Sequence, residues 1–259
     1  MNIMKNRICF FLLIIVSINL SYSQGKTSTD TIGTFSDSRD GHVYKWIKIG
    51  TQIWMAENLA YLPVVSPSSE ESENEPYYYV KGYEGTSVSE AEASANYTTY
   101  GVLYNWSAAM AGEASSNRNP SGVQGVCPSG WHLPSHREWI KLIYLCTELT
   151  NVLGAQQAGV LKESGMAHWQ SPNAGATNES GFTALPGGYR SSDTDIFDLS
   201  FLTSDGNFFG LGFYGAWWSA SQCGAARAWG RRISFDDRDV TSFYTAKEDG
   251  FSVRCRRDN

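Results

Sequence analysis

The sequence predicts an α+β domain in which antiparallel strands, one or two main helices and long loops follow one another. A β-hairpin pattern begins the folded part, one well-capped helix lies near the middle, and β-patterned segments fill the last third. Strands and helices that are separated along the chain in this way are typical of α+β folds. The composition agrees, because 9 Trp, 14 Tyr, 12 Phe and 25 Gly favour β-structure and loops over a helical bundle.

The first 23 residues have the pattern of a secretory signal peptide. Lys5 and Arg7 form a positive start, residues 8–16 are apolar, and Ser21 and Ser23 place small residues before a cleavage point after residue 23. The apolar stretch is shorter than the roughly 20 residues that a membrane-spanning helix needs. The alternative is an uncleaved amphipathic helix or short anchor.

Export sets the expected surroundings and charge of the protein. Cys9 lies inside the apolar stretch, so a lipid-modified N-terminal cysteine is not expected, and no later stretch is suited to cross a membrane. We expect the protein in the periplasm, on the outer surface or secreted. Removing Lys5 and Arg7 from the 20 basic residues leaves 18 against 26 acidic ones, a net charge of −8. This charge argues against a nucleic-acid partner, because phosphate contacts supply much of that affinity.

The folded part is expected to begin with a hairpin. Residues 24–37 are polar and rich in Ser, Thr and Gly, so they predict a flexible leader, with the fold starting near Asp40. Residues 43–49 alternate as a half-buried strand, and Gly50 begins a two-residue turn. Residues 52–55 are the predicted second strand of the hairpin.

The next segments are less regular. Residues 66–76 hold four Glu among Ser, Asn and Pro and predict a solvated loop. Residues 77–100 predict an irregular, aromatic-rich excursion, residues 103–111 a short helix, and residues 117–125 another loop.

The clearest helix is predicted to start after Ser135. Ser135 and Glu138 have the spacing of a capping box, in which each side chain accepts a hydrogen bond from the other residue's backbone N–H. The apolar residues that follow share one helical stripe, which predicts a core face and an inward Cys146. They are Trp139, Leu142, Ile143, Cys146 and Leu149.

After Gly181 the pattern becomes β. The predicted strands are residues 182–185, 216–219, 228–235 and 251–256, with a turn at 236–239. Because successive strand residues face opposite sides, we expect either Trp217 or Trp218, but not both, to lie in the core.

Four cysteines would remain after signal cleavage: Cys127, Cys146, Cys223 and Cys255. An oxidising compartment makes pairing plausible, but four cysteines allow three pairings and spacing alone does not choose among them. No CxxC motif suggests a zinc ribbon or a thioredoxin-type site.

The motifs of common enzymes are missing from the sequence. It contains no G-x-S-x-G and no G-x-x-x-x-G-K-[ST]. His132 and His136 are four apart, but Pro134 separates them, so they need not share a helical face. Cys223 alone suggests a disulfide partner or a buried thiol more than a nucleophile or copper ligand. We expect no metal, no cofactor and no catalytic residue.

The strongest indication of ligand binding is a set of Trp and Tyr residues close to Arg in the sequence. Trp and Tyr beside Arg suit sugar or protein recognition when they are exposed, and the same residues are core when they are buried. The candidate binding residues are Trp169, Tyr189, Arg190, Tyr214, Trp229 and Arg231.

Seven segments in order carry a family resemblance. They are residues 40–44 (DGHVY), 49–59 (IGTQIWMAENL), 100–106 (YGVLYNW), 127–134 (CPSGWHLP), 180–190 (SGFTALPGGYR), 217–219 (WWS) and 250–255 (GFSVRC). From residue 38 to 259 the chain resembles the Fibrobacter succinogenes major paralogous domain. The resemblance implies a C-type-lectin-like fold, related to that of the formylglycine-generating sulfatase modifiers, with paired N- and C-terminal strands. It also implies a disulfide between Cys127 and Cys255 and an exported protein of the kind found in Bacteroidetes.

The resemblance leaves the function open. The calcium-site motifs of sugar-binding C-type lectins are not present, although a non-standard calcium site stays open, and Cys223 lacks the partner cysteine that the formylglycine-generating enzymes use. We expect a non-enzymatic binding or adhesion module that recognises a glycan or a surface protein through its loop face. The alternatives are a structural cell-surface component without a small ligand and a copper-dependent oxidase-like enzyme.

Overall fold

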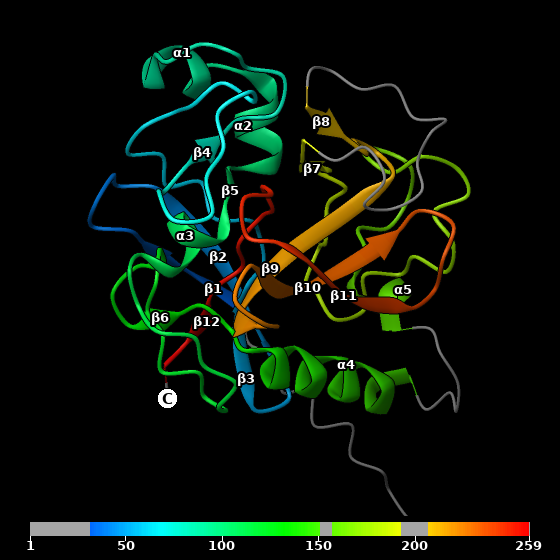
Figure 1. The fold of residues 1–259 in the computed structure, drawn as a ribbon. Helices are drawn as coiled ribbons and strands as arrows, with labels where there is room; N and C mark the ends of the chain where they lie inside the picture. Colours follow the sequence, from blue (N-terminus) through cyan, green and yellow to red (C-terminus); the bar gives the residue numbers. More distant parts are fainter. Residues whose placement is uncertain (1–31, 151–156, 193–206, 259) are drawn as a thin grey trace, which may run out of the picture.

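The computed structural model describes residues 32–150, 157–192 and 207–258, which form a mixed α+β fold (Figure 1). Its two larger sheets have three and five strands, and every strand pair in these ranges is antiparallel. This mixture of antiparallel sheets and few helices confirms the predicted α+β class. No helix within these ranges is long and apolar enough to cross a membrane.

The five-stranded sheet joins the two ends of the described chain. Its order is β1 (Ile32–Ser36), β2 (Val43–Ile49), β3 (Gln52–Met55), β12 (Arg256–Arg257) and β6 (Trp131–His132). The predicted hairpin is confirmed in β2 and β3, and Gly50 takes a positive φ of 57° in its turn. The last strand pairs with β3 through Arg256 and Trp54, so the C-terminal strand completes the sheet of the N-terminal hairpin.

The predicted flexible leader is wrong for its last residues. Ile32–Ser36 form β1, which pairs with β2 from Ile32 opposite Ile47 to Ser36 opposite Val43. Phe35 stacks on Trp131 with ring centroids 4.4 Å apart, so this polar-looking strand is anchored by one aromatic side chain. The predicted signal peptide and residues 24–31 lie outside the described residues.

The three-stranded sheet has the order β11 (Val240–Ala246), β10 (Arg227–Ser234) and β9 (Tyr214–Gln222). The predicted strands 216–219 and 228–235 fall within or nearly within β9 and β10, and the predicted turn at 236–239 separates β10 from β11. Residues 182–185 do not form a strand, which corrects the prediction. Thr183 adopts a positive φ of 53° there, and this breaks the extended backbone.

Smaller elements fill the connections between the sheets. The paired short strands are β4 (Tyr78–Tyr79) with β5 (Leu103–Tyr104) and β7 (Tyr189–Arg190) with β8 (Phe208–Phe209). The short helices are α1 (Val88–Glu92), α2 (Ala95–Tyr100), α3 (Trp106–Met110) and α5 (Gln157–Leu161). Of the predicted strand 251–256, only Arg256 belongs to a described strand, and Phe251 and Ser252 make isolated bridges.

Helix α4 (His136–Thr150) confirms the predicted capping box. The Ser135 Oγ accepts the Glu138 N–H at 3.2 Å, and the Glu138 Oε2 accepts the Ser135 N–H at 2.9 Å. Of the predicted core stripe, Trp139, Leu142 and Cys146 are buried, Ile143 is half-buried, and the side chain of Leu149 lies outside the described part of the chain. The helix lies beneath β9 and β10 (Figure 1), and its apolar face packs into a core cluster that includes Trp217 of β9.

Strand β9 is covered on both faces, which corrects the prediction for its tryptophans. Trp217 is 1% exposed and packs in the cluster on the α4 side, whereas Trp218 is 0% exposed and packs in the cluster on the opposite side. Each indole N–H has a partner, since Trp217 Nε1 donates to Asn58 Oδ1 at 2.9 Å and Trp218 Nε1 donates to the Tyr104 carbonyl at 2.7 Å. The alternation of the strand is intact, but neither face meets solvent here.

The disulfide between Cys127 and Cys255 is present, with its Cα atoms 5.9 Å apart. It links the loop before β6 to the chain that enters β12. Cys146 and Cys223 do not pair with each other: Cys146 is buried and Cys223 is half-buried, and both are free thiols.

Candidate functional site

Five of the six predicted binding residues are buried, so their side chains are not exposed in the way that the predicted ligand contact requires. Their exposed fractions are 2% for Trp169, 0% for Tyr189, 0% for Arg190, 6% for Tyr214 and 0% for Arg231. The sixth, Trp229, is half-buried and remains partly open to solvent.

Internal partners account for this burial. Trp169 Nε1 donates to the Ala184 carbonyl at 3.0 Å, and Tyr189 stacks between the rings of Phe209 and Phe251. The Trp169 N–H and the Tyr189 ring therefore have partners inside the protein.

The buried Arg190 holds part of the acidic loop in place. Its Nε donates to the Ser68 carbonyl at 2.7 Å, and its Nη1 lies 2.7 Å from the Glu71 Oε2. The loop at 66–76 is largely exposed as predicted, but this buried guanidinium ties it to β7.

Three rings around Trp229 form what we call the aromatic platform: His136, Trp229 and Tyr244. Trp229 of β10 lies directly across from Tyr244 of β11, with ring centroids 5.3 Å apart. The His136 ring at the start of α4 lies 4.6 Å from the Trp229 ring. Tyr244 is 51% exposed, so the platform presents one open aromatic side chain beside one that is half-buried.

The buried Arg231 sets the tautomer of His136. Its Nη2 donates to the His136 carbonyl at 3.1 Å, and its Nη1 lies 3.1 Å from the His136 Nδ1. Because a guanidinium only donates, Nδ1 accepts and the ring proton of neutral His136 sits on Nε2. Burial, with the nearby charge of Arg231, lowers the pKa of His136 to about 4. The platform therefore has an uncharged N–H donor at pH 7.

A polar cavity of about 250 Å³ adjoins the platform and shares Tyr244 with it. Its lining residues are Ser192, Arg227, Tyr244, Thr245, Ala246, Glu248 and Asp249. The Arg227 guanidinium lies 5.8 Å from the Tyr244 ring centroid.

The two carboxyl groups of this cavity both have a raised pKa. Burial raises the pKa of Asp249 to about 6, against the hydrogen bond that Thr245 Oγ1 donates at 2.5 Å. Burial also raises the pKa of Glu248, helped by the negative charges of Glu71 and Glu73. The lining supplies hydrogen-bond donors through Arg227 and acceptors through the carboxyl oxygens of Glu248 and Asp249.

Sequence reasoning missed Tyr244, Arg227 and His136 as neighbours of Trp229. The segment of β11 is rich in β-branched and aromatic residues, which is a strand signal, but the pairing register with β10 places Tyr244 opposite Trp229. A register depends on the connecting turn and on burial, so composition could suggest the strand without suggesting the platform.

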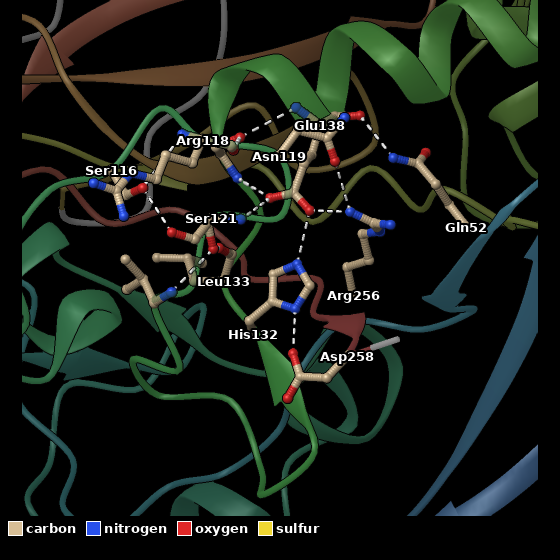
Figure 2. Close-up of polar contacts among 12 residues, drawn as sticks. Gln52, Ser116, Arg118, Asn119, Ser121, His132, Leu133, Glu138, Arg256 and Asp258 are labelled. Atoms are coloured by element: carbon tan, nitrogen blue, oxygen red, sulfur yellow. Dashed lines mark hydrogen bonds and ion pairs between the residues drawn. The ribbon is translucent and has the colours of Figure 1, made fainter.

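A second polar cluster is centred on the buried carboxylate of Glu138 (Figure 2). His132 Nε2 lies 2.8 Å from Glu138 Oε1, and Arg256 Nη1 donates to the same oxygen. The other oxygen, Oε2, accepts the backbone N–H groups of Ser121 at 3.0 Å and Ser135 at 2.9 Å. On its far side the His132 ring meets Asp258, with 2.6 Å between Nδ1 and Oδ1.

This cluster ties β6, α4 and β12 together. Burial opposes ionisation of Glu138, but the hydrogen bonds and charges of His132, Ser135 and Arg256 outweigh it and lower its pKa. Both carboxylate oxygens are occupied and the side chain is 0% exposed, so the cluster offers no open acceptor to a ligand.

His132 and His136 have separate partners, one in the Glu138 cluster and the other on the platform. Within the described ranges, no three His, Cys, Asp or Glu side chains gather in a way that could hold a metal ion.

Among known proteins, the chain matches one family model. No curated protein and no solved structure matches the chain significantly. The family model of the Fibrobacter succinogenes major domain matches residues 47–257, a span that begins inside β2 and includes β3, the disulfide, α4 and the aromatic platform. The chain therefore belongs to the Fibrobacter succinogenes major domain family.

Proposed function

We propose that this chain is an exported, non-enzymatic binding module that holds a saccharide against Trp229 and Tyr244. The observation that carries the proposal is the cross-strand pair of aromatic rings on β10 and β11, toward the end of the two strands that lies away from their connecting turn. Tyr244 of this pair is 51% exposed. Aromatic side chains with a polar tip suit a ligand that has both an apolar and a hydroxyl-bearing surface, as a sugar ring does.

The polar cavity beside Tyr244 supports a saccharide ligand. Sugar hydroxyls donate and accept hydrogen bonds, and the cavity supplies Arg227 as a donor and Glu248 as an acceptor. His136 adds an uncharged N–H donor on the other side of Trp229. A stable protein partner would need roughly 800 Å² of surface on this side, more than a pair of rings and a small cavity present.

Export is supported by two features. The N-terminal sequence has the pattern of a signal peptide, and the Cys127–Cys255 disulfide suits an oxidising compartment. We further infer a C-type-lectin-like fold, supported by the C-terminal strand that completes the sheet of the N-terminal hairpin.

The proposal is tested by screening the purified protein against a glycan array and measuring each hit by calorimetry. Trp229→Ala and Tyr244→Ala should each weaken binding at least about tenfold, since truncating a central aromatic contact costs about 2 kcal/mol or more. Tyr144→Ala is the matched control, because Tyr144 is 55% exposed on α4 and lies about 12 Å along the helix axis from His136.

Three results would count against the proposal. They are no saccharide bound at millimolar concentration, hits that bind the two platform variants as tightly as the native protein, and hits that Tyr144→Ala weakens equally. Thermal melts of each variant identify any loss of binding that comes from unfolding.

A further inference from the structure

A groove of about 470 Å³ lies over the outer part of the five-stranded sheet, away from the aromatic platform. Strands β1 and β2 form its floor, and Ala56 and Glu57 follow β3 at one end. The opposite wall comes from α2 and the loop before β7, and the residues of that wall are Thr99, Gly181, Thr183 and Leu185. The volume falls in the range of about 300–1,000 Å³ that is typical of small-molecule sites.

Strand alternation decides which side chains of the floor face the groove. Ile32 pairs with Ile47 and Thr34 with Lys45, so these four side chains share one face of the sheet. The Trp46 ring lies on the other face, against Gly33, where an added Cβ would come within 2.5 Å of the indole. On this face Ile32, Thr34 and Lys45 are exposed, whereas Ile47 lies beneath them and is 3% exposed.

Glu57 places a fixed negative charge at the end of this apolar floor. Its Oε1 accepts the Lys45 backbone N–H at 2.5 Å, which holds the half-buried carboxylate beside the groove. No ion pair joins Glu57 to any cation within the described ranges. Its second oxygen has no hydrogen-bond partner among these residues, so it can accept one from a ligand.

Two cations, Lys45 and Arg254, lie near this carboxylate, but neither forms an ion pair with it within the described ranges. The Lys45 side chain is exposed at the rim and long enough to stay in water. Arg254 is buried behind the wall, and its donors go to Asn58 Oδ1 at 3.0 Å, to the Thr183 carbonyl at 2.7 Å and to the Phe182 carbonyl. The negative charge of Glu57 favours the Arg254 cation, but the hydrogen bonds of Arg254 go to these other acceptors and leave the second Glu57 oxygen available.

The wall opposite the floor is held in an unusual conformation. Thr183 has a φ of +53°, a region that a β-branched residue rarely adopts. Asn178 Oδ1 accepts its N–H at 2.9 Å, and Arg254 donates to its carbonyl. Backbone strain that the surroundings enforce in this way is concentrated at ligand sites.

We propose that this groove binds a small amphipathic amine, with its apolar body against Ile32 and Leu185, above the buried Ile47, and its ammonium group at Glu57. The proposal is independent of saccharide binding, because the groove and the aromatic platform share no residue. A ligand of this class combines the apolar contact that the floor offers with the only half-buried carboxylate that lines the groove.

The test compares three probes that differ only in the head group: n-hexylammonium, hexanoate and 1-hexanol. Each is titrated into isotope-labelled protein and followed by NMR shifts of the Ile47 and Leu185 methyl groups. Hexylammonium should bind at least about fivefold tighter than either of the other probes. Shortening it to butylammonium should weaken binding by about fourfold for each methylene removed, the factor that corresponds to about 0.8 kcal/mol.

Variants locate the charge and the site. Glu57→Gln keeps an oxygen for the Lys45 N–H but removes the charge, and it should weaken hexylammonium binding roughly tenfold. Glu75→Gln, at an exposed position in the acidic loop, is the matched control and should leave binding unchanged. Ala56→Phe should fill the groove and abolish binding of all three probes, with a thermal melt to establish that the variant is folded.

The proposal is overturned if hexanoate or hexanol binds as tightly as hexylammonium, since the carboxylate would then play no part. It is also overturned if no probe shifts the Ile47 and Leu185 methyl signals, or if Glu57→Gln and Glu75→Gln behave alike. Should Ala56→Phe fail to fold, the methyl shifts of the native protein alone decide whether the probe occupies the groove.

Discussion

Replacing Glu138 with Gln should destabilise the fold by about 3–5 kcal/mol. The native carboxylate is 0% exposed and receives Arg256, whose side chain is 5% exposed, together with His132. Gln keeps the shape but not the charge, so the Arg256 guanidinium would stay buried without its counter-ion. Removing one partner of a buried ion pair costs about 3–5 kcal/mol for this reason.

The pH dependence of this variant should separate the charge from the packing. The folded-state pKa of Glu138 is below its ordinary value, so the folded protein binds this proton less readily than the unfolded chain. Its stabilisation is therefore fully present above the ordinary pKa of about 4.5 and is lost as the pH falls through the lower folded value. Glu138→Gln should remove this part of the acid-induced loss of stability.

Urea unfolding followed by the fluorescence of the nine tryptophans measures both effects. Glu148→Gln is the matched control, because Glu148 is an exposed residue of the same helix and its replacement should change stability by less than about 0.5 kcal/mol. If Glu138→Gln costs less than about 1 kcal/mol at pH 7, or keeps the acid dependence of the native protein, the buried ion pair does not have the role described here.

Three further predictions follow from the described contacts. Cys255→Ala should cost roughly 5 kcal/mol in the chain-entropy model, because the disulfide closes a loop with a sequence separation of 128; a urea midpoint unchanged from that of the native protein would contradict this. The His136 ring signals should titrate by NMR near pH 4, below the ordinary 6.5, and a midpoint above about 6 would contradict the burial of this ring beside the Arg231 charge. Trp218→Ala should cost about 3–5 kcal/mol in the same unfolding assay because Trp218 is fully buried against Phe251; a loss below about 1 kcal/mol would mean that the site is loosely packed.

Elements that local chemistry specifies were predictable. The hairpin of β2 and β3 follows from residue alternation and from Gly50, which tolerates the positive φ of its turn. The start of α4 follows from Ser135 and Glu138, which satisfy each other's backbone N–H groups within four residues of chain. The Cys127–Cys255 pairing came from the family resemblance and not from spacing, and the structure confirms it.

Elements that depend on distant partners were not predictable. The polar strand β1 is anchored by the stacking of Phe35 on Trp131, nearly a hundred residues away in sequence. The segment at 182–185 has a residue composition typical of a strand. However, Arg254 donates to two of its carbonyls, and Thr183 has a positive φ that interrupts the extended backbone. A local pattern carries no information about such partners.

The sequence alone determined the α+β class, the opening hairpin, the capped helix and the family, because each rests on local periodicity, capping or a motif order that is read directly from the chain. Which aromatic side chains meet solvent depends instead on how distant segments pack together. This tertiary packing buries Trp217 and Trp218 on opposite faces of one covered strand and leaves Trp229 beside Tyr244, toward the end of the sheet that lies away from the turn between β10 and β11. The physical reason is that burial depends on what packs over each face, and the covering elements come from distant parts of the chain.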